Sequence, residues 1–103
     1  MGASEVHPVS DQTRPQVSFV AFIYSLASNA AVHFGDLEDP VTRERRAPNL
    51  DAAAQMIDII TMLQEKTRGN LSAEERQLVD QVLFELRMRF VQAKKEQSPI
   101  IQP

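Results

Sequence analysis

One set of side chains in this sequence has the residue types and the spacing that chemistry requires. Ser25, Asn29 and His33 follow one another at intervals of four residues, which places them on one face of a helix. Asp36 comes three residues after His33, and a histidine beside carboxylates can bind a metal ion or transfer protons. The same arrangement is typical of a solvated stripe, a polar seam between helices or a histidine at a helix C-terminus. We therefore treat Ser25, Asn29 and His33 as a candidate polar seam and predict no catalytic residue.

The sequence lacks the patterns of the common catalytic and metal sites. A metal site needs three or four ligands, and Asp36, Glu38 and Asp39 do not follow the spacing of a known calcium loop. No strand–turn–helix pattern presents a serine nucleophile, and no glycine-rich loop precedes Lys66 and Thr67. The chain has no cysteine, which excludes disulfides, thiolate metal sites and cysteine nucleophiles. We expect a protein without a cofactor and without a metal.

The charge of the chain argues against a nucleic-acid partner. The formal net charge is −3 at pH 7, whereas nucleic-acid-binding domains usually present a basic surface. One segment with Arg87, Arg89, Lys94 and Lys95 is basic, but it has no aromatic and basic platform on which bases would stack. Glu85 precedes Arg89 by four residues, which predicts an ion pair within one helix.

The apolar periodicity predicts an all-α fold. The chain has 103 residues, enough for one small domain. Its apolar residues predict three helices, at about residues 17–34, 50–67 and 73–96, and no alternating strand pattern of useful length occurs. We expect a helical domain over residues 16–96, with a flexible N-terminal segment at 1–15 and a flexible C-terminal segment at 97–103. The short link between the second and third helices predicts an antiparallel hairpin.

Local signals place the helix ends. Asn49 has the type and position of an N-cap, and Ser72 with Glu75 forms the pattern of a capping box. Gly35 and Gly69 follow the first and second helices, where a residue in the left-handed conformation commonly ends a helix.

The first helix is the only segment with the length and low charge of a membrane span. Residues 15–35 contain no Asp, Glu, Lys or Arg, and such a length could cross a bilayer. Its polar side chains, however, gather on one stripe of the helical wheel, which favours an amphipathic helix. Residues 1–14 lack the basic region and apolar core of a secretory signal. We therefore expect a cytoplasmic protein, with membrane association through the first helix as an alternative.

The third helix carries two apolar faces. Its main face is formed by Leu78, Val79, Val82, Leu83, Leu86 and Phe90. A second stripe of Phe84, Met88 and Val91 lies roughly opposite, at spacings of four and three residues. A helix with two apolar faces normally lies between two layers, and three helices supply only one such layer. We predict that Phe84, Met88 and Val91 contact another chain, most simply a second copy; the alternative is that the N-terminal segment or the first interhelical loop covers them.

Three blocks of the sequence resemble a known family. They are Ser25-Leu26-Ala27 with Ala30, His33-Phe34-Gly35 and Asp39-Pro40; Asn49-Leu50 with Ala53, Ile57-Asp58 and Leu63; and Glu65 to Ser72 with Glu74-Glu75, Leu83 to Arg87 and Arg89-Phe90. Over about residues 19–91 the chain is similar to the bacterial family called domain of unknown function 1844 (DUF1844). The resemblance implies a bacterial, mostly helical protein and transfers no activity, substrate or catalytic residue. One position departs from the family pattern, because Thr42-Arg43 stands where Thr-Gly is expected.

These observations favour a non-enzymatic, cytoplasmic helical module that serves as an interaction or adaptor subunit. We expect it to self-associate as a dimer or tetramer, and a different protein is a further candidate partner. A second interpretation is a small enzyme or a ligand- or metal-binding protein. Its site would combine Ser25, Asn29 and His33 with a carboxylate such as Asp58. The third interpretation is a membrane-associated protein.

Overall fold

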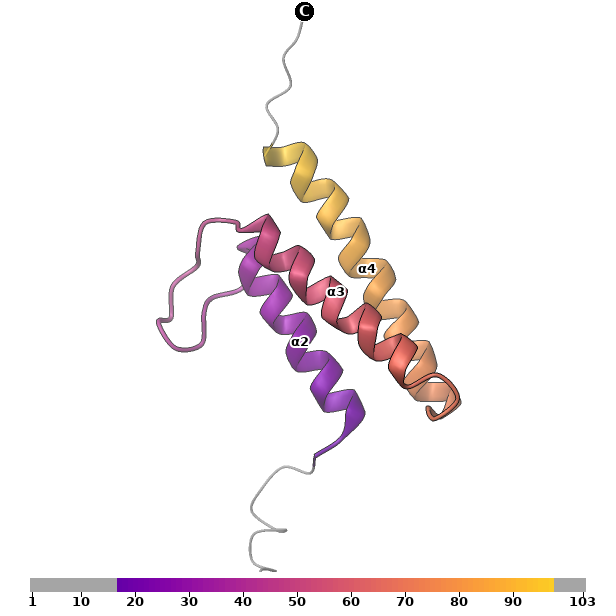
Figure 1. The fold of residues 1–103 in the computed structure, drawn as a ribbon. Helices are drawn as coiled ribbons and strands as arrows, with labels where there is room; N and C mark the ends of the chain where they lie inside the picture. Colours follow the sequence, from indigo (N-terminus) through magenta and orange to yellow (C-terminus); the bar gives the residue numbers. More distant parts are fainter. Residues whose placement is uncertain (1–16, 98–103) are drawn as a thin grey trace, which may run out of the picture.

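The computed structural model of this chain describes residues 17–97, which form three helices (Figure 1). They are α2 (Phe19–Phe34), α3 (Leu50–Lys66) and α4 (Ala73–Gln97). The expected all-α fold is confirmed, since the described residues contain no strand and a single isolated bridge between Glu38 and Arg45. Apart from Gln97, which ends α4, the segments expected to be flexible at 1–15 and 97–103 lie outside the described residues.

The helices begin where side chains can cap them. The Ser18 hydroxyl accepts a hydrogen bond from the backbone N–H of Ala21 at 3.0 Å, which is why α2 starts two residues later than the apolar pattern suggests. The Asn49 side chain caps α3 in the same way, with 3.1 Å to the N–H of Ala52. At α4 the capping box is complete. Ser72 Oγ accepts from the N–H of Glu75 at 3.1 Å, and the Glu75 carboxylate accepts from the N–H of Ser72 at 2.8 Å.

Gly35 ends α2 in a left-handed conformation with φ of 86°. Its N–H donates to the carbonyl of Val32, and the N–H of Asp36 donates to the carbonyl of Ala31, which is the pattern of a Schellman motif. A Cβ atom at Gly35 would lie 3.0 Å from the backbone oxygen of Arg46. The helix end and the returning loop therefore approach each other at a distance that only glycine permits.

The three helices bury one shared core. α2 packs on both α3 and α4, and α3 packs on α4. Figure 1 shows α3 and α4 joined by a short turn as an antiparallel hairpin, with the α2–α3 loop at the opposite end. The buried side chains are Ile23, Leu26, Ala30 and Phe34 from α2, Leu50, Ala53, Ile57 and Ile60 from α3, and Val79, Val82, Leu83 and Ala93 from α4. Because α4 contributes one face to this core, no other part of the described structure covers its opposite face.

The loop between α2 and α3 is organised by the buried carboxylate of Asp39. This carboxylate accepts hydrogen bonds from the N–H groups of Val41, at 2.8 Å, and Thr42, at 3.4 Å, and it forms an ion pair with Arg46. The turn forces Arg43 into the left-handed region at φ of 63°. This is the position at which the family pattern leads us to expect glycine, and the structure supplies the reason for that expectation.

Candidate functional site

The outer face of α4 presents three large apolar side chains to solvent. Phe84 is 65 % exposed, Met88 57 % and Val91 52 %. Their spacing of four and three residues places them in one row, which we call the α4 stripe. The core-facing residues of the same helix, Val79 and Leu83, are almost completely buried. Within the described residues nothing covers the α4 stripe, and its predicted contact with another chain stays a prediction.

A groove runs beside the α4 stripe, between α3 and α4. It has a volume of about 290 Å³, and it is lined by Ala54, Ile57, Asp58, Arg87, Phe90 and Val91. Val91 belongs both to the stripe and to the groove, so the two form one continuous apolar surface. The charged residues at the groove, Asp58 and Arg87, are exposed. Arg87 donates a hydrogen bond to the Thr61 hydroxyl at 2.9 Å, which fixes α4 against α3 beside the groove.

The candidate polar seam lies on the surface of α2. Ser25 and Asn29 are exposed, and His33 is half-buried. The Ser25 hydroxyl donates to the carbonyl of Phe22 in its own helix at 2.9 Å. His33 Nδ1 is buried and has no hydrogen-bond partner among the described residues. Within residues 17–97 Ser25 and Asn29 therefore form a solvated stripe, and no helix of this part of the chain encloses the seam.

The carboxylates near His33 have other partners. Asp36 binds Arg89, and Asp39 binds Arg46. The hydrogen bonds from Arg89 hold the pKa of Asp36 below its ordinary value of 3.8. The N–H of Val41, followed by the Arg46 side chain, likewise holds the pKa of Asp39 below its ordinary value. Both groups therefore stay ionised and paired at neutral pH, which is unsuited to a general acid or base.

The residues expected to form a ligand or metal site do not converge. Asp58, the carboxylate considered for such a site, lines the groove between α3 and α4, which Ser25, Asn29 and His33 do not line. Within residues 17–97 no three His, Asp or Glu side chains come together in a way that could hold a metal ion. The described structure thus gives the enzymatic and metal-binding interpretation no assembled site.

The contact that sequence reasoning missed joins the α2–α3 loop to α4. Arg89 Nε and Nη2 donate to the two Asp36 oxygens at 2.7 and 2.8 Å, and the guanidinium lies 5.3 Å from the centroid of the Phe34 ring. The expected ion pair of Arg89 with Glu85 is wrong, because Arg89 points to Asp36 and, at 3.4 Å, to Glu96. The two bidentate partners are 53 residues apart, so no local spacing indicates this pair.

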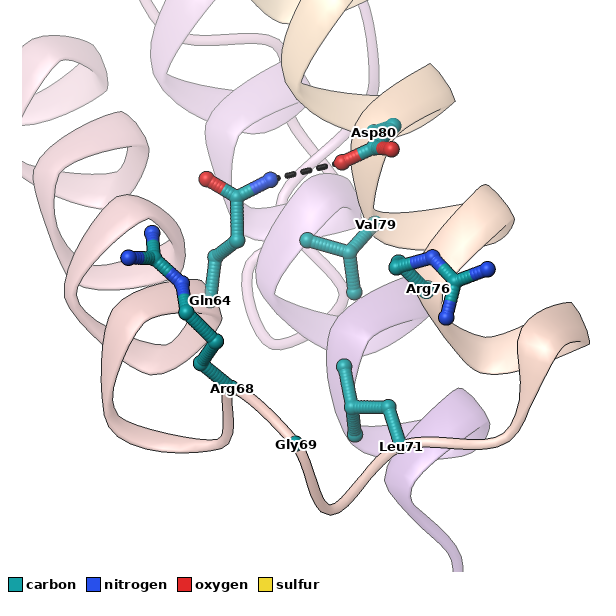
Figure 2. Close-up of a pocket in the computed structure, with 7 residues that line it drawn as sticks. All are labelled: Gln64, Arg68, Gly69, Leu71, Arg76, Val79 and Asp80. Carbon is teal, nitrogen blue, oxygen red and sulfur yellow. Dashed lines mark hydrogen bonds between the residues drawn. The ribbon is translucent and has the colours of Figure 1, made fainter.

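A second pocket, of about 420 Å³, lies at the turn between α3 and α4. Figure 2 shows Arg68 and Arg76 on opposite sides of it, with the apolar Leu71 between them. The side chain of Gln64 donates to Asp80 at 2.7 Å across the same pocket. Because the carboxylate of Asp80 lies beside the two arginines, the pocket lacks the uniformly positive lining of an anion site. The hydrogen bond between Gln64 and Asp80 instead links the two helices of the hairpin.

None of the three described helices combines the length and the apolar character that crossing a bilayer requires.

Comparison with known proteins gives a family and no function. No curated protein matches the chain, and no solved structure matches it. The family model described as "Domain of unknown function (DUF1844)" matches residues 16–92, which include α2, α3 and most of α4. Since this match covers most of the chain and nearly all of its described part, the protein belongs to the DUF1844 family.

Proposed function

We propose that this chain is a non-enzymatic interaction module that self-associates through the α4 stripe. The observation that carries the proposal is the exposure of Phe84, Met88 and Val91 in one row, at 65 %, 57 % and 52 %. Single exposed apolar residues are common on protein surfaces, but a contiguous row beside an apolar groove is typical of an interaction site.

The energetic gain from covering this row is substantial. Fully burying a side chain of this size contributes about 1.5–3 kcal/mol, so covering the exposed halves of three contributes about 3–5 kcal/mol per copy. Two copies that cover each other gain about twice that amount, against an association cost of about 4–15 kcal/mol. The stripe alone therefore supports weak association, and a stable complex also needs the surface next to it.

Absolute mass measured by light scattering on a sizing column tests the proposal. We expect the wild-type chain to exceed its monomer mass of 11.6 kDa increasingly between concentrations of about 10 µM and 1 mM. The double variant Phe84→Asp with Met88→Asp should stay monomeric, because each carboxylate would be buried in the interface. Both side chains are exposed in the single chain, so the variant should keep its helical circular dichroism.

The matched control is Tyr24→Asp, which changes an aromatic residue that is 54 % exposed on α2. It should associate like the wild type. A wild-type chain that is monomeric over the whole range would refute the proposal. The same holds if the double variant and the wild type have equal mass.

We also propose that this module works in the cytoplasm of a bacterium, because the family resemblance implies a bacterial protein and the polar stripe of the first helix argues against a membrane anchor. Fractionation of untagged protein tests this placement. Recovery in the soluble supernatant is expected, and recovery in the membrane pellet would instead favour an anchor through the first helix.

A further inference from the structure

The α4 stripe lies beside a groove that has room for a side chain. Phe84 is the most exposed of the three stripe residues, and the groove next to Phe90 and Val91 has about 290 Å³ of space, room for a large side chain. We propose, building on the self-association proposed above, that a second copy of this chain docks with its α4 antiparallel to the first. Phe84 of each copy then occupies the groove of the other, and Asp58 of each copy pairs with Arg87 of the other.

The spacing along α4 fits this arrangement. Phe84 and the Phe90–Val91 end of the groove are six to seven residues apart, or about 10 Å along the helix. A two-fold axis near Met88 brings each Phe84 level with the groove of the other copy. Met88 then lies close to the axis, where a flexible thioether adapts well to its own symmetry mate. A parallel pair would instead stack Phe84 on Phe84 and leave both grooves empty.

The surface required also favours filling the groove. A stable interface usually buries about 800 Å² on each partner, and three half-exposed side chains supply less than that. Docking into the groove adds the half-buried lining residues Ala54 and Phe90 to the buried area, at a groove whose floor includes the core residue Ile57. The antiparallel arrangement thus covers the stripe and the groove together, whereas a contact through the stripe alone leaves the groove in water.

The charges at the groove select the occupant. Asp58 on α3 and Arg87 on α4 both line it and are both exposed, and neither forms an ion pair within residues 17–97. An antiparallel two-fold pair turns the same flank of both copies toward each other. Such a flank can pair with a copy of itself only if it carries both an acidic and a basic residue. Asp58 and Arg87 meet this requirement, because Asp58 of one copy can pair with Arg87 of the other, and Arg87 of the first with Asp58 of the second.

Charge reversal separates contacts between copies from contacts within one chain. Asp58→Arg and Arg87→Asp should each weaken association at least about tenfold, because like charges then face each other twice per dimer. An equimolar mixture of the two variants should recover dimer mass as a heterodimer, since each junction then pairs Arg with Asp. In each single variant residues 58 and 87 carry charges of the same sign and cannot pair within one chain. Recovery of the dimer mass on mixing therefore reports only pairing between copies.

Glu85 on the opposite flank of the α4 stripe supplies the control. Glu85→Arg should associate like the wild type, and adding Arg87→Asp to it should form no dimer beyond that of Glu85→Arg alone. A parallel dimer predicts the reverse, because it turns the Glu85 flank toward Arg87. Recovery only in the Glu85→Arg mixture, or in neither mixture, overturns the antiparallel arrangement while leaving self-association intact. A monomeric wild-type chain overturns both.

Discussion

The contact between Asp36 and Arg89 gives the sharpest stability prediction for this domain. Arg89 donates two hydrogen bonds to Asp36, at 2.7 and 2.8 Å, with side-chain exposures of 30 % and 41 %. Exposed ion pairs contribute about 0.2–1 kcal/mol, and bidentate geometry with partial burial places this one near the upper end, at about 1 kcal/mol. We expect Asp36→Asn to lower the free energy of unfolding by about 1 kcal/mol. Arg89→Met should lower it by about 2 kcal/mol, because the contact with the Phe34 ring contributes a further 0.5–1 kcal/mol or so.

A double-mutant cycle measured by urea and thermal unfolding checks this value. The two substitutions should show a coupling of about 1 kcal/mol, which corresponds to about 4–8 °C in Tm for a domain of this size. All four proteins should carry Phe84→Asp, so that self-association does not shift the apparent stability. Additive effects, with a coupling below about 0.3 kcal/mol, would show that the pair contributes nothing in solution.

The same pair predicts a dependence on pH with a definite sign. Arg89 holds the pKa of Asp36 below its ordinary value of 3.8. A carboxyl with a depressed folded-state pKa stabilises the protein above its unfolded pKa, and this contribution is lost as the pH falls through the folded-state value. The stability difference between the wild type and Asp36→Asn should be constant near neutral pH and shrink from about pH 5 downward. A difference that grew on acidification would refute the assignment.

Five further substitutions, at four positions, test the turns and caps, each by thermal unfolding. Arg43→Gly should raise stability by about 0.5–1 kcal/mol, because glycine relieves the left-handed φ of 63°; a loss would mean that the Arg43 side chain contributes more than this strain costs. Gly69→Ala should lower the free energy of unfolding by about 1 kcal/mol, because Gly69 has a φ near 87°. Gly35 has the same φ, but a Cβ there would also lie 3.0 Å from a backbone oxygen, so Gly35→Ala should cost at least about 1 kcal/mol more. Equal losses of stability in the two variants would contradict this close contact. Ser72→Ala should cost about 1 kcal/mol and Ser72→Gly only a few tenths, so a neutral Ser72→Ala would exclude a stabilising capping box.

The helix ends could be predicted from the sequence because the groups that define them are local. A cap such as Asn49 or Ser72 acts on an N–H group three residues away, and Gly35 acts within one turn. The main apolar face of α4 could be predicted for a similar reason, since Val79, Val82 and Leu83 share one side of a helix and all three are buried. Such features depend on backbone geometry that every helix shares.

The Asp36–Arg89 pair could not be predicted, because it depends on how the helices pack. Spacing along α4 offers Glu85 as the partner of Arg89, and the structure chooses Asp36 from a loop 53 residues away. The Schellman end of α2 turns Asp36 toward α4, and the packing of α2 on α4 brings the two groups within hydrogen-bonding distance. The candidate polar seam illustrates the opposite case. The spacing of Ser25 and Asn29 correctly places them on one face of α2, but only the packing shows that this face meets solvent.

The architecture of α4 separates stability from association. Its core face and Arg89 pack toward α2, so they determine whether a single chain folds. Phe84, Met88 and Val91 point away from that core, and substitutions at such exposed positions usually change monomer stability by less than about 0.5 kcal/mol. A polar or charged stripe would therefore have kept the fold and improved solubility. The exposed parts of Phe84, Met88 and Val91 are therefore free to contact a second copy, as we propose, at little cost to the folding of the single chain.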